Sequence, residues 1–540
     1  MGYLALENNS DIVEGVSAVF PAFFLLIAAL VCITTMTRMI EEERTEIGTL
    51  KALGYSRMSI MRKYFTYAGS AAVVGCGIGT ISGSIIFPLI LWDAYQIIIT
   101  LGDYFLIRIN WPLCIIVVTV YTAVTLFVTW YCCHKTLIEV PAELIRPKAP
   151  ANGKSLLLEK LSIWRRMSFL NKVMIRNVFR YRQRLFMMLV GVGGCTALLL
   201  AGFGIRDSIG DLSEIQFNEI ILYDHEIRFT EELSQLDIDE FSNEFTDEIV
   251  DIFFYHQSTM ELEFDNQLAN VNFIVAESDL SRFIDFHQGK NALAMPKLGE
   301  ALISVGMAER LHISEGDLIC VRDDNLSTFS LKVSGIFDNN VYNYVIISPK
   351  TFENQMGYSP EIQTACIYAD PSSDMHEVGA NFGQYKNVMS VSVNEDVRTT
   401  VGQMLDALDL VVISIVICAS FLAIIVTYNL TNINITERLR EIATIKVLGF
   451  RSLETASYVF KENMLISCIG SLLGIGGGVF LLNFIISEIQ VDFVWISPRL
   501  QTVSYFLAFA FTLLSAVLVD VVLYYKLKKI NMAEALKSVE

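Results

Sequence analysis

The residues that come closest to a catalytic motif are Asn152-Gly153-Lys154-Ser155, because a Gly-Lys-Ser triplet ends the phosphate-binding loop of many nucleotide hydrolases. That loop also requires a glycine at position 148, where this chain has Lys148. It follows a β-strand, whereas Pro147 and Pro150 disfavour a strand here. The segment therefore does not predict an ATP site, and we expect no ATPase activity from the chain itself.

Histidine and cysteine side chains show no metal-binding spacing. The six histidines have no His-x-x-x-His pattern and no bracketing Glu, so we expect them at strand ends or on the surface. They are His134, His225, His256, His287, His312 and His376. Cys320 and Cys366 lie in alternating apolar segments, and their positions are compatible with a disulfide or with two buried free thiols. We predict no metal site and no cofactor.

A duplicated segment carries the most informative charged and apolar pattern. Residues 46–55 (Glu-Ile-Gly-Thr-Leu-Lys-Ala-Leu-Gly-Tyr) and 441–450 (Glu-Ile-Ala-Thr-Ile-Lys-Val-Leu-Gly-Phe) share six of ten residues. Each copy predicts a short helix that ends at Gly54 or Gly449, since glycine readily takes the left-handed C-cap conformation. Apolar residues at three-residue spacing mark one face of each helix: Ile47, Leu50 and Leu53, and Ile442, Ile445 and Leu448.

Two interpretations of this repeat remain open. A solvated or membrane-surface loop helix would explain one copy, with Glu46 and Lys51 turned away from the apolar face. Loop formation alone does not explain why a second copy keeps six of ten side chains. A cytoplasmic partner with twofold symmetry would explain both copies.

The repeat extends into two glycine stripes. Gly75, Gly79 and Gly83 correspond to Gly470, Gly474 and Gly478 at the same offset of 395 residues. Glycines four apart lie on one helix face and let a second helix approach closely. We predict helix packing at both stripes, either as packing within each half or as an interface between pseudo-symmetric halves.

The elements that position these residues are membrane spans. Apolar residues make up 53% of the 540 residues, only 18% are charged, and mean hydropathy is +0.47, which excludes an ordinary soluble enzyme. Seven stretches can cross a hydrocarbon core of about 30 Å. They are residues 17–37, 64–92, 112–133, 185–205, 410–436, 463–487 and 502–525. Asp520 interrupts the last one, and we interpret it as an interfacial group that bonds to backbone or lysine, with a proton relay as the alternative.

Lysine and arginine counts give the orientation. Residues 38–64, 134–184, 431–461 and 526–540 hold 27 of the 40 basic residues. The short segments 1–16, 93–111 and 488–501 hold none, one and one. By the positive-inside rule, we expect the N-terminus outside and the C-terminus in the cytoplasm of a cell whose plasma membrane holds the spans.

A large acidic segment separates the two halves. Residues 206–406 contain 36 acidic and 11 basic side chains, which indicates a soluble extracytoplasmic domain. Alternating polarity predicts β-strands at residues 226–229, 259–264, 270–275, 317–321, 328–333, 343–347, 366–369 and 389–393, so we expect an α+β domain. The fold class is thus an α-helical polytopic membrane protein with seven transmembrane helices and one large α+β domain. The acidity either keeps the domain soluble or favours cationic ligands.

The resulting domain plan has six parts. They are an extracytoplasmic stub (1–16), a first module of three spans (17–146), a basic linker with an amphipathic helix suited to anionic lipid or to a cytoplasmic partner (147–184), a span (185–205), the outer domain (206–406) and a second module of three spans (407–540). The first half has no counterpart of residues 185–406, so we expect a span and an outer domain to belong before Met1.

Residues 37–55 and 437–450 resemble the signature of FtsX-like permeases, the membrane subunits of MacB-type ABC transporters. Residues 176–182 resemble the basic segment before the first span of such proteins, and short pieces within 300–336 resemble their outer domain. The family has four spans per half with the outer domain between the first and second. The resemblance therefore implies a fused double permease that lacks its N-terminal span and first outer domain.

The resemblance implies a partner ATPase, as a dimer, that clamps the two repeats, with membrane lipids and an unknown extracytoplasmic ligand or protein as further partners and no nucleic acid. The implied coupling residues are Glu46, Ile47, Leu50, Lys51, Gly54, Glu441, Ile442, Ile445, Lys446 and Gly449. The implied work is export, lipoprotein or peptide handling, or cell-envelope signalling. A sensor or scaffold with a non-ATPase cytoplasmic partner is the main alternative. A secondary transporter is disfavoured because charges at the midplane are absent from the sequence.

Overall fold

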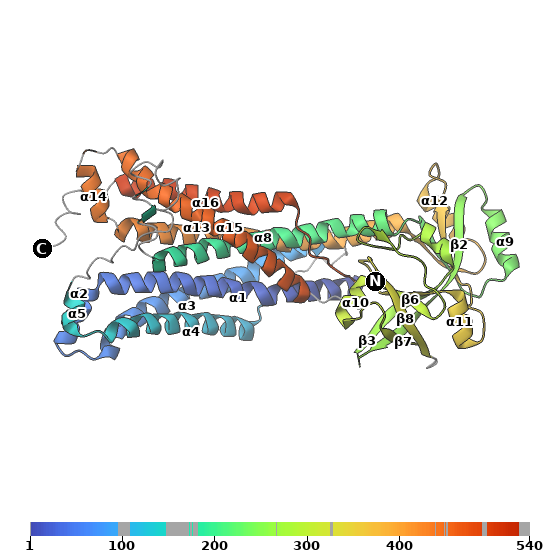
Figure 1. Ribbon diagram of the computed structural model, residues 1–540, viewed down its shortest axis with the longest axis horizontal. Coiled ribbons are helices and arrows are strands. Elements are labelled where there is room, and N and C mark those ends of the chain that lie inside the picture. Colours follow the sequence, from blue (N-terminus) through green and yellow to red (C-terminus); the bar gives the residue numbers. More distant parts are fainter. Residues whose placement is uncertain are drawn as a thin grey trace. The chain divides into compact units, whose positions relative to one another are not determined.

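Seven long apolar helices and one mixed α+β unit make up the computed structural model (Figure 1). The structure describes residues 2–95, 108–146, 172, 175–176, 182–265, 267–323, 328–437, 439–447, 449, 452–488 and 494–528. Contacts divide the chain into two units. The helical unit contains residues 13–206, 409–488 and 500–540, and the outer unit contains residues 1–12, 207–408 and 489–499.

The membrane helices are α1 (Gly2–Glu42), α3 (Arg57–Tyr95), α4 (Trp111–Leu137), α8 (Arg182–Ile215), α13 (Asn394–Glu437), α15 (Ser452–Glu488) and α16 (Thr502–Lys528). Each contains an apolar window long enough to cross a membrane, which confirms the seven predicted spans and the fold class. Several helices continue beyond their apolar windows, and α8 and α13 each contribute residues to both units.

The helical unit consists of two modules built alike. The first contains α1, α2 (Arg44–Ala52), α3, α4 and α5 (Pro141–Ile145), and the second contains α13, α14 (Leu439–Val447), α15 and α16. Equivalent positions form the two apolar cores, since Ile40 and Ile47 in the first core match Ile435 and Ile442 in the second. The duplication seen in the sequence is therefore a duplication of structure.

Helix α8 packs directly on the glycine stripe of α15. A Cβ atom on Gly474 would lie 2.4 Å from the backbone oxygen of Gly193, and one on Gly478 would lie 2.8 Å from the Cβ of Leu200. Thr196 and Thr512 also share a hydrogen bond of 3.0 Å between α8 and α16. Because lipid competes with side chains for dispersion contact, such close backbone approach is what makes two membrane helices prefer each other.

The equivalent stripe on α3 has a different environment. A Cβ atom on Gly75, Gly79 or Gly83 would meet nothing within 4 Å. None of the apolar window of α3 is buried, whereas 44% of the α15 window is. The structure thus places a helix on the second stripe and none of its described residues on the first.

The outer unit is organised around a nine-stranded sheet with the order β11-β1-β10-β2-β3-β9-β6-β8-β7. Its strands are β1 (His225–Phe229), β2 (Ile249–Phe264), β3 (Gln267–Val275), β6 (Glu300–Ser304), β7 (Leu318–Arg322), β8 (Thr328–Phe337), β9 (Tyr344–Ile347), β10 (Thr364–Ala369) and β11 (Val388–Val393), with β4 (His287–Gln288) and β5 (Asn291–Ala292) forming a separate hairpin. Strand β2 also pairs with β7, which closes six strands from β2 to β7 into a barrel.

Strand β2 is long enough to pair with a strand of the open part of the sheet and with a strand of the barrel. Its first half pairs with β10, and its second half pairs with β3 from His256 onward. Barrel side chains such as Phe273 and Phe329 fill one core, and an aromatic cluster around Phe241 and Phe382 fills the core beside the open part. The helices α9 (Gln235–Glu244), α10 (Val305–Leu311), α11 (Pro349–Met356) and α12 (Met375–Gly383) complete the outer unit.

Replacing Gly474 with leucine should destabilise the protein, because the new side chain would overlap the backbone of α8. Overpacking of this kind typically costs about 1–3 kcal/mol. Gly79→Leu is the matched control, since the same side chain on α3 meets no described atom and should change stability by less than about 0.5 kcal/mol. Thermal unfolding in detergent, followed by fluorescence-detected size exclusion, measures both. An equal loss in the two variants would contradict the assigned packing.

Candidate coupling site

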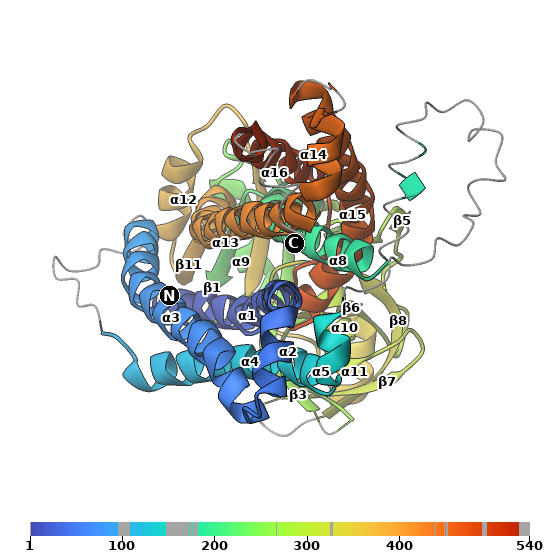
Figure 2. The same ribbon diagram turned by 90° about the vertical axis from the view of Figure 1, so that its left-hand side faces the viewer.

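Helix α2 is fastened inside its own module. Ile47 is only 2% exposed and belongs to the core that α3 and α4 form, and Leu50 packs against the same core. A Cβ atom on Gly48 would lie 2.9 Å from the Cβ of Leu144, so this glycine allows α5 to lie directly against α2 (Figure 2). Two of the three predicted face residues, Ile47 and Leu50, are therefore covered by the module itself, whereas Leu53 is exposed.

Lys51 joins α2 to the end of α4. Its Nζ donates hydrogen bonds to the backbone oxygens of Leu137, at 2.8 Å, and of Glu139, at 2.5 Å. The last carbonyl groups of a helix have no partner within the helix, and a cation also interacts favourably with that end of the helix dipole. Arg44 adds an ion pair with Glu139. These contacts hold α2 against the last turn of a membrane helix.

Charged side chains at the start of α2 also bond to α3. Glu43 accepts hydrogen bonds from Tyr64, at 2.6 Å, and from Lys63, at 2.9 Å. Burial alone would raise the pKa of Glu43, but the hydrogen bonds from Tyr64 and Lys63 hold that pKa below its usual value. Glu46 lies 3.6 Å from Lys63, and both side chains face solvent. Glu46 therefore contributes to the charged rim.

The turn after α2 exposes apolar side chains. Gly54 ends the helix at a φ of +89°, and Tyr55 N donates to Leu50 O at 3.1 Å across the turn. Apolar side chains on both sides of Gly54 are exposed: Leu53 is 71% exposed, Tyr55 55% and Met58 68%. We call these three residues the α2 tip. Three large apolar side chains exposed beside a charged rim are a typical partner-binding surface.

The second module repeats the anchor. Ile442 is fully buried, and Lys446 Nζ donates to Leu527 O at 2.9 Å, at the end of α16. Burial lowers the pKa of Lys446. Gly449 has a φ of +94°, like Gly54 in the first copy. The exposed Val447, which we call the α14 tip, follows the buried face.

The predicted coupling residues whose side chains are described pack largely inside their own modules, which the sequence did not indicate. Ile47, Leu50 and Lys51 pack within the module, as do Ile442 and Lys446, whereas a partner-facing surface was expected from the apolar face. The side chains of Glu441, Ile445 and Leu448 lie outside the described residues. Tyr55 and Met58 were missed, although their position after a C-cap glycine was a signal.

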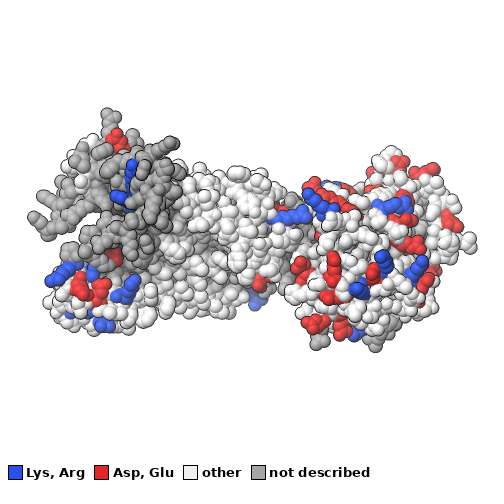
Figure 3. Space-filling model, in the orientation of Figure 1, with Lys and Arg blue, Asp and Glu red and all other residues white. Residues whose placement is uncertain are grey.

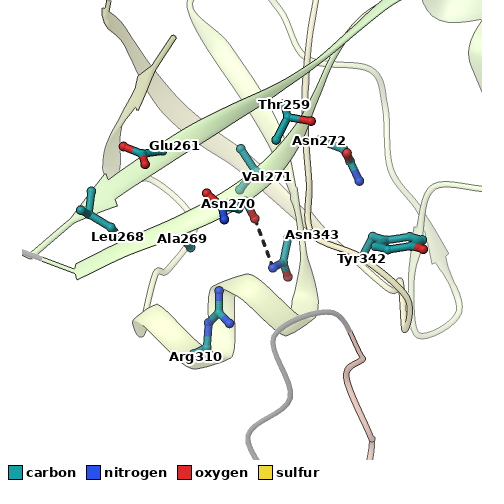
Figure 4. A pocket seen from close by; sticks show the side chains of 10 residues that line it. All are labelled: Thr259, Glu261, Leu268, Ala269, Asn270, Val271, Asn272, Arg310, Tyr342 and Asn343. Atoms are coloured by element: carbon teal, nitrogen blue, oxygen red, sulfur yellow. Dashed lines mark hydrogen bonds between the residues drawn. The ribbon is translucent and has the colours of Figure 1, made fainter. Parts of the chain in front are cut away.

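A hollow of about 440 Å³ in the outer unit is a second candidate site (Figure 4). Its lining is mainly polar: Thr259, Glu261, Asn270, Asn272, Arg310, Tyr342 and Asn343, with Leu268, Ala269 and Val271. Strands β2 and β3 form one wall, and Arg310 of α10 points toward it. Asn343 Nδ2 donates to Asn270 O at 3.4 Å. Amide and charged groups of this kind suit a polar ligand.

The structure also describes the other residues for which the sequence predicted a bond or a binding role. Asp520 accepts a hydrogen bond of 2.7 Å from the side-chain amide of Asn463, whereas a lysine or a backbone group was the predicted partner. Cys320 and Cys366 are free thiols on separate strands. Among the described residues, no group of three or more His, Cys, Asp or Glu is placed to hold a metal ion. The Gly-Lys-Ser triplet and most of the 147–184 linker lie outside the described residues.

Charge distinguishes the surfaces of the two units. Acidic side chains, with fewer basic ones, are scattered over the outer unit, whereas the described surface of the membrane helices is almost free of both (Figure 3). Near α2, basic and acidic side chains gather again. An uncharged belt on the helices matches a hydrocarbon environment.

Comparison with known proteins identifies the two modules. Residues 18–138 and 413–532 each match the model of the FtsX-like permease C-terminal family. Both modules are therefore FtsX-like permease modules, and such permeases are membrane components of ABC transporters. No curated protein gives a significant sequence match.

Two solved structures are similar to part of the chain. One is the periplasmic region of MacB from Actinobacillus actinomycetemcomitans, with 11% identity over 34% of this chain and 97% of that chain and a TM-score of 0.24. The other is the extracellular domain of the noncanonic ABC-type transporter YknZ from Gram-positive bacteria, with 12% identity over 31% of this chain and 98% of that chain and a TM-score of 0.23.

Proposed function

We propose that this chain is a double permease subunit that couples ATP hydrolysis by a separate ATPase to movement of its outer domain. The observation that carries the proposal is the pair of matched permease modules, each with a short helix fastened to the end of a membrane helix. In each module the first apolar residue of the short helix, Ile47 or Ile442, is buried in the module core, and exposed residues at the end of the helix are left for a partner. Two short helices at equivalent positions of the repeat suit an ATPase dimer with twofold symmetry.

The exposed tips refine the predicted contact residues. Glu46 remains a candidate contact because it is exposed at the charged rim. Ile47, Leu50 and Lys51 act as anchors that make the tip and its membrane helices move together. Gly54 and Gly449 set the direction of the chain at each tip through their positive φ angles.

Helices α8 and α13 provide the route to the outer domain, because each is one helix from the membrane window into the outer unit. The segment between α15 and α16 adds a third connection. Trp495 N donates to Asn340 O at 2.8 Å, and Val494 forms a β-bridge with Val341. We propose that displacement of α15 and α16 reaches the outer domain at this bridge as well.

A charge placed on a tip should abolish ATPase binding without unfolding the permease. Burying an unpaired carboxylate in an interface costs several kcal/mol, and each 1.4 kcal/mol is about tenfold in affinity. We therefore expect Leu53→Asp and Val447→Asp to lower co-purified, vanadate-sensitive ATPase activity at least tenfold, at unchanged yield of folded permease.

Two controls separate coupling from folding. Thr49→Asp places the same charge on an exposed polar position of α2 and should retain the ATPase, whereas Ile47→Asp should lower the yield of folded protein because it charges the core. If both tip variants retain the ATPase at wild-type stoichiometry, the tips are not the coupling surface. A stable complex with a partner that binds no nucleotide would favour the sensor or scaffold, whose ligand site would be the polar hollow.

We also propose that the tips face the cytoplasm and the outer domain faces outside, because the basic residues concentrate in the segments that contain the tips. In a cysteine-free background, a cysteine at the exposed Leu236 should react with an impermeant maleimide in intact cells. A cysteine at Met58 should react only after permeabilisation. Reaction at Met58 in intact cells, with none at Leu236, would reverse the orientation.

A further inference from the structure

The polar hollow lies where one strand of the barrel has a neighbouring strand on one side only. Strand β3 pairs with β2 along residues 267–275, but β9 pairs with it only from Asn272 onward. No other strand among the described residues pairs with residues 267–271 on that side. These residues therefore form an open edge of the sheet, and four of them, 268–271, line the hollow (Figure 4).

The main-chain groups of Leu268 and Asn270 point toward this open edge. The N–H and C=O groups of every second residue of a strand point to the same side. Asn272 N donates to Asn343 O at 2.8 Å, on the side of β9, so residues 270 and 268 face that side as well. Asn343 Nδ2 reaches Asn270 O over a long 3.4 Å, and no described residue bonds to the main chain of Leu268 there. The edge thus presents a short row of backbone groups without a strand partner.

The composition of this edge also differs from that of a protected one. Natural proteins usually block an open edge with lysine, proline or a bulge. Residues 268–272 have the sequence Leu-Ala-Asn-Val-Asn, which contains neither lysine nor proline, and their pairing with β2 has no shift in register. The edge is therefore able to accept another strand.

The opposite rim of the hollow is a strained and well-held turn. Tyr342 has a φ of +61°, which is unusual for a bulky residue and costs on the order of 1–3 kcal/mol. The buried Asn339 holds the turn, since its Nδ2 donates to Val341 O at 2.6 Å and to Tyr342 O at 2.9 Å. Asn339 in turn accepts a hydrogen bond of 2.9 Å from Gln216. Such strain is typical of ligand-binding segments, and here it keeps a half-exposed tyrosine ring at the hollow.

The charge of the lining indicates what kind of ligand fits. Glu261 and Arg310 are the charged residues among the described lining residues, so the lining has no net charge, although the outer domain as a whole holds 36 acidic and 11 basic side chains. Three carboxamides, of Asn270, Asn272 and Asn343, complement peptide groups, which each carry one donor and one acceptor. The volume of about 440 Å³ lies in the usual range of ligand pockets.

We propose that the polar hollow binds an extended peptide, which adds as a strand to the open edge of β3. The main chain of the peptide bonds to the N–H and C=O of Leu268 and to the N–H of Asn270, and Tyr342 packs against one of its side chains. This inference does not rest on the proposed function, because the pairing requires neither an ATPase nor the tips.

The test uses the full chain in nanodiscs and a phage-displayed library of linear seven-residue peptides. Peptides are selected on the wild-type chain, and their affinities are then measured on variants. Leu268→Pro removes the N–H that points to the open edge, and it should fold because this N–H does not bond to β2. We expect it to weaken the selected peptides at least tenfold. Leu268→Ala is the matched control: it keeps the N–H and should change affinity less than about threefold.

Two further measurements separate strand addition from other binding. Tyr342→Asn keeps the left-handed turn, since asparagine tolerates it, but removes the ring, so it should weaken binding at an unchanged unfolding temperature. N-methylation of a selected peptide at every second nitrogen should abolish binding in one frame and spare it in the other, because alternate N–H groups of a strand face its partner.

Three outcomes would overturn the proposal. The first is a library that yields no peptide weakened by Leu268→Pro. The second is N-methylation that acts alike in both frames, which would show that the peptide does not bind as a strand. The third is a set of peptides that tolerate Leu268→Pro but lose affinity in Arg310→Gln, which would make the hollow a site for a charged group instead.

Discussion

The attachment of a lysine on each short helix to backbone carbonyls at the end of a membrane helix is the interaction on which the proposed coupling depends. Helices α2 and α14 have nine residues each, too short to be stable alone in water. Lys51 and Lys446 bind them to the ends of α4 and α16, and Ile47 and Ile442 bury their apolar faces in the module cores. A force applied at a tip therefore reaches a membrane helix without first unfolding the short helix.

Close packing then determines which helices move together. Helix α8 approaches α15 at backbone distance through Gly193 and Gly474, and it also contacts α1 and α13 through Gly194 and Gly202. Such contacts permit little sliding, so α8 should follow its neighbours as one body. Because α8 and α13 both contribute residues to the outer unit, motion of the helical unit has a continuous covalent route to the unit that contains the polar hollow.

Much of the fold could be predicted because membrane spans appear in the sequence as long apolar stretches, and the duplicated module appears as matching residues at a fixed offset. Polarity alternation also located strands such as β8, whose residues alternate between exposed and buried along most of its length. Strand β6 was missed because Ala301 to Ser304 are all buried, so no alternation exists. The pairing of β2 with β7 depends on contacts between distant segments that no local pattern encodes.

The sequence predicted a short helix with one apolar face in each module, but it did not indicate what covers that face. Spacing identified one apolar face on α2, but spacing cannot tell whether a partner or the same module covers that face. In the structure the same module covers most of this face. Gly48 allows α5 to lie against α2, and Lys51 donates a hydrogen bond to the backbone oxygen of Leu137. Likewise, two stripes of identical spacing have different neighbours, because occupancy depends on which helices are present to pack.

The most direct test of mechanical coupling is a distance measurement by double electron–electron resonance on the complex with its ATPase. One label pair reports the tips, at Leu53 and Val447, and a second reports the outer domain against the helical unit, at Leu236 and Trp111, all of which are exposed. The account predicts that trapping with ATP and vanadate shifts both distance distributions, whereas ADP shifts neither. A shift at the tips with an unchanged distribution between Leu236 and Trp111 would contradict it.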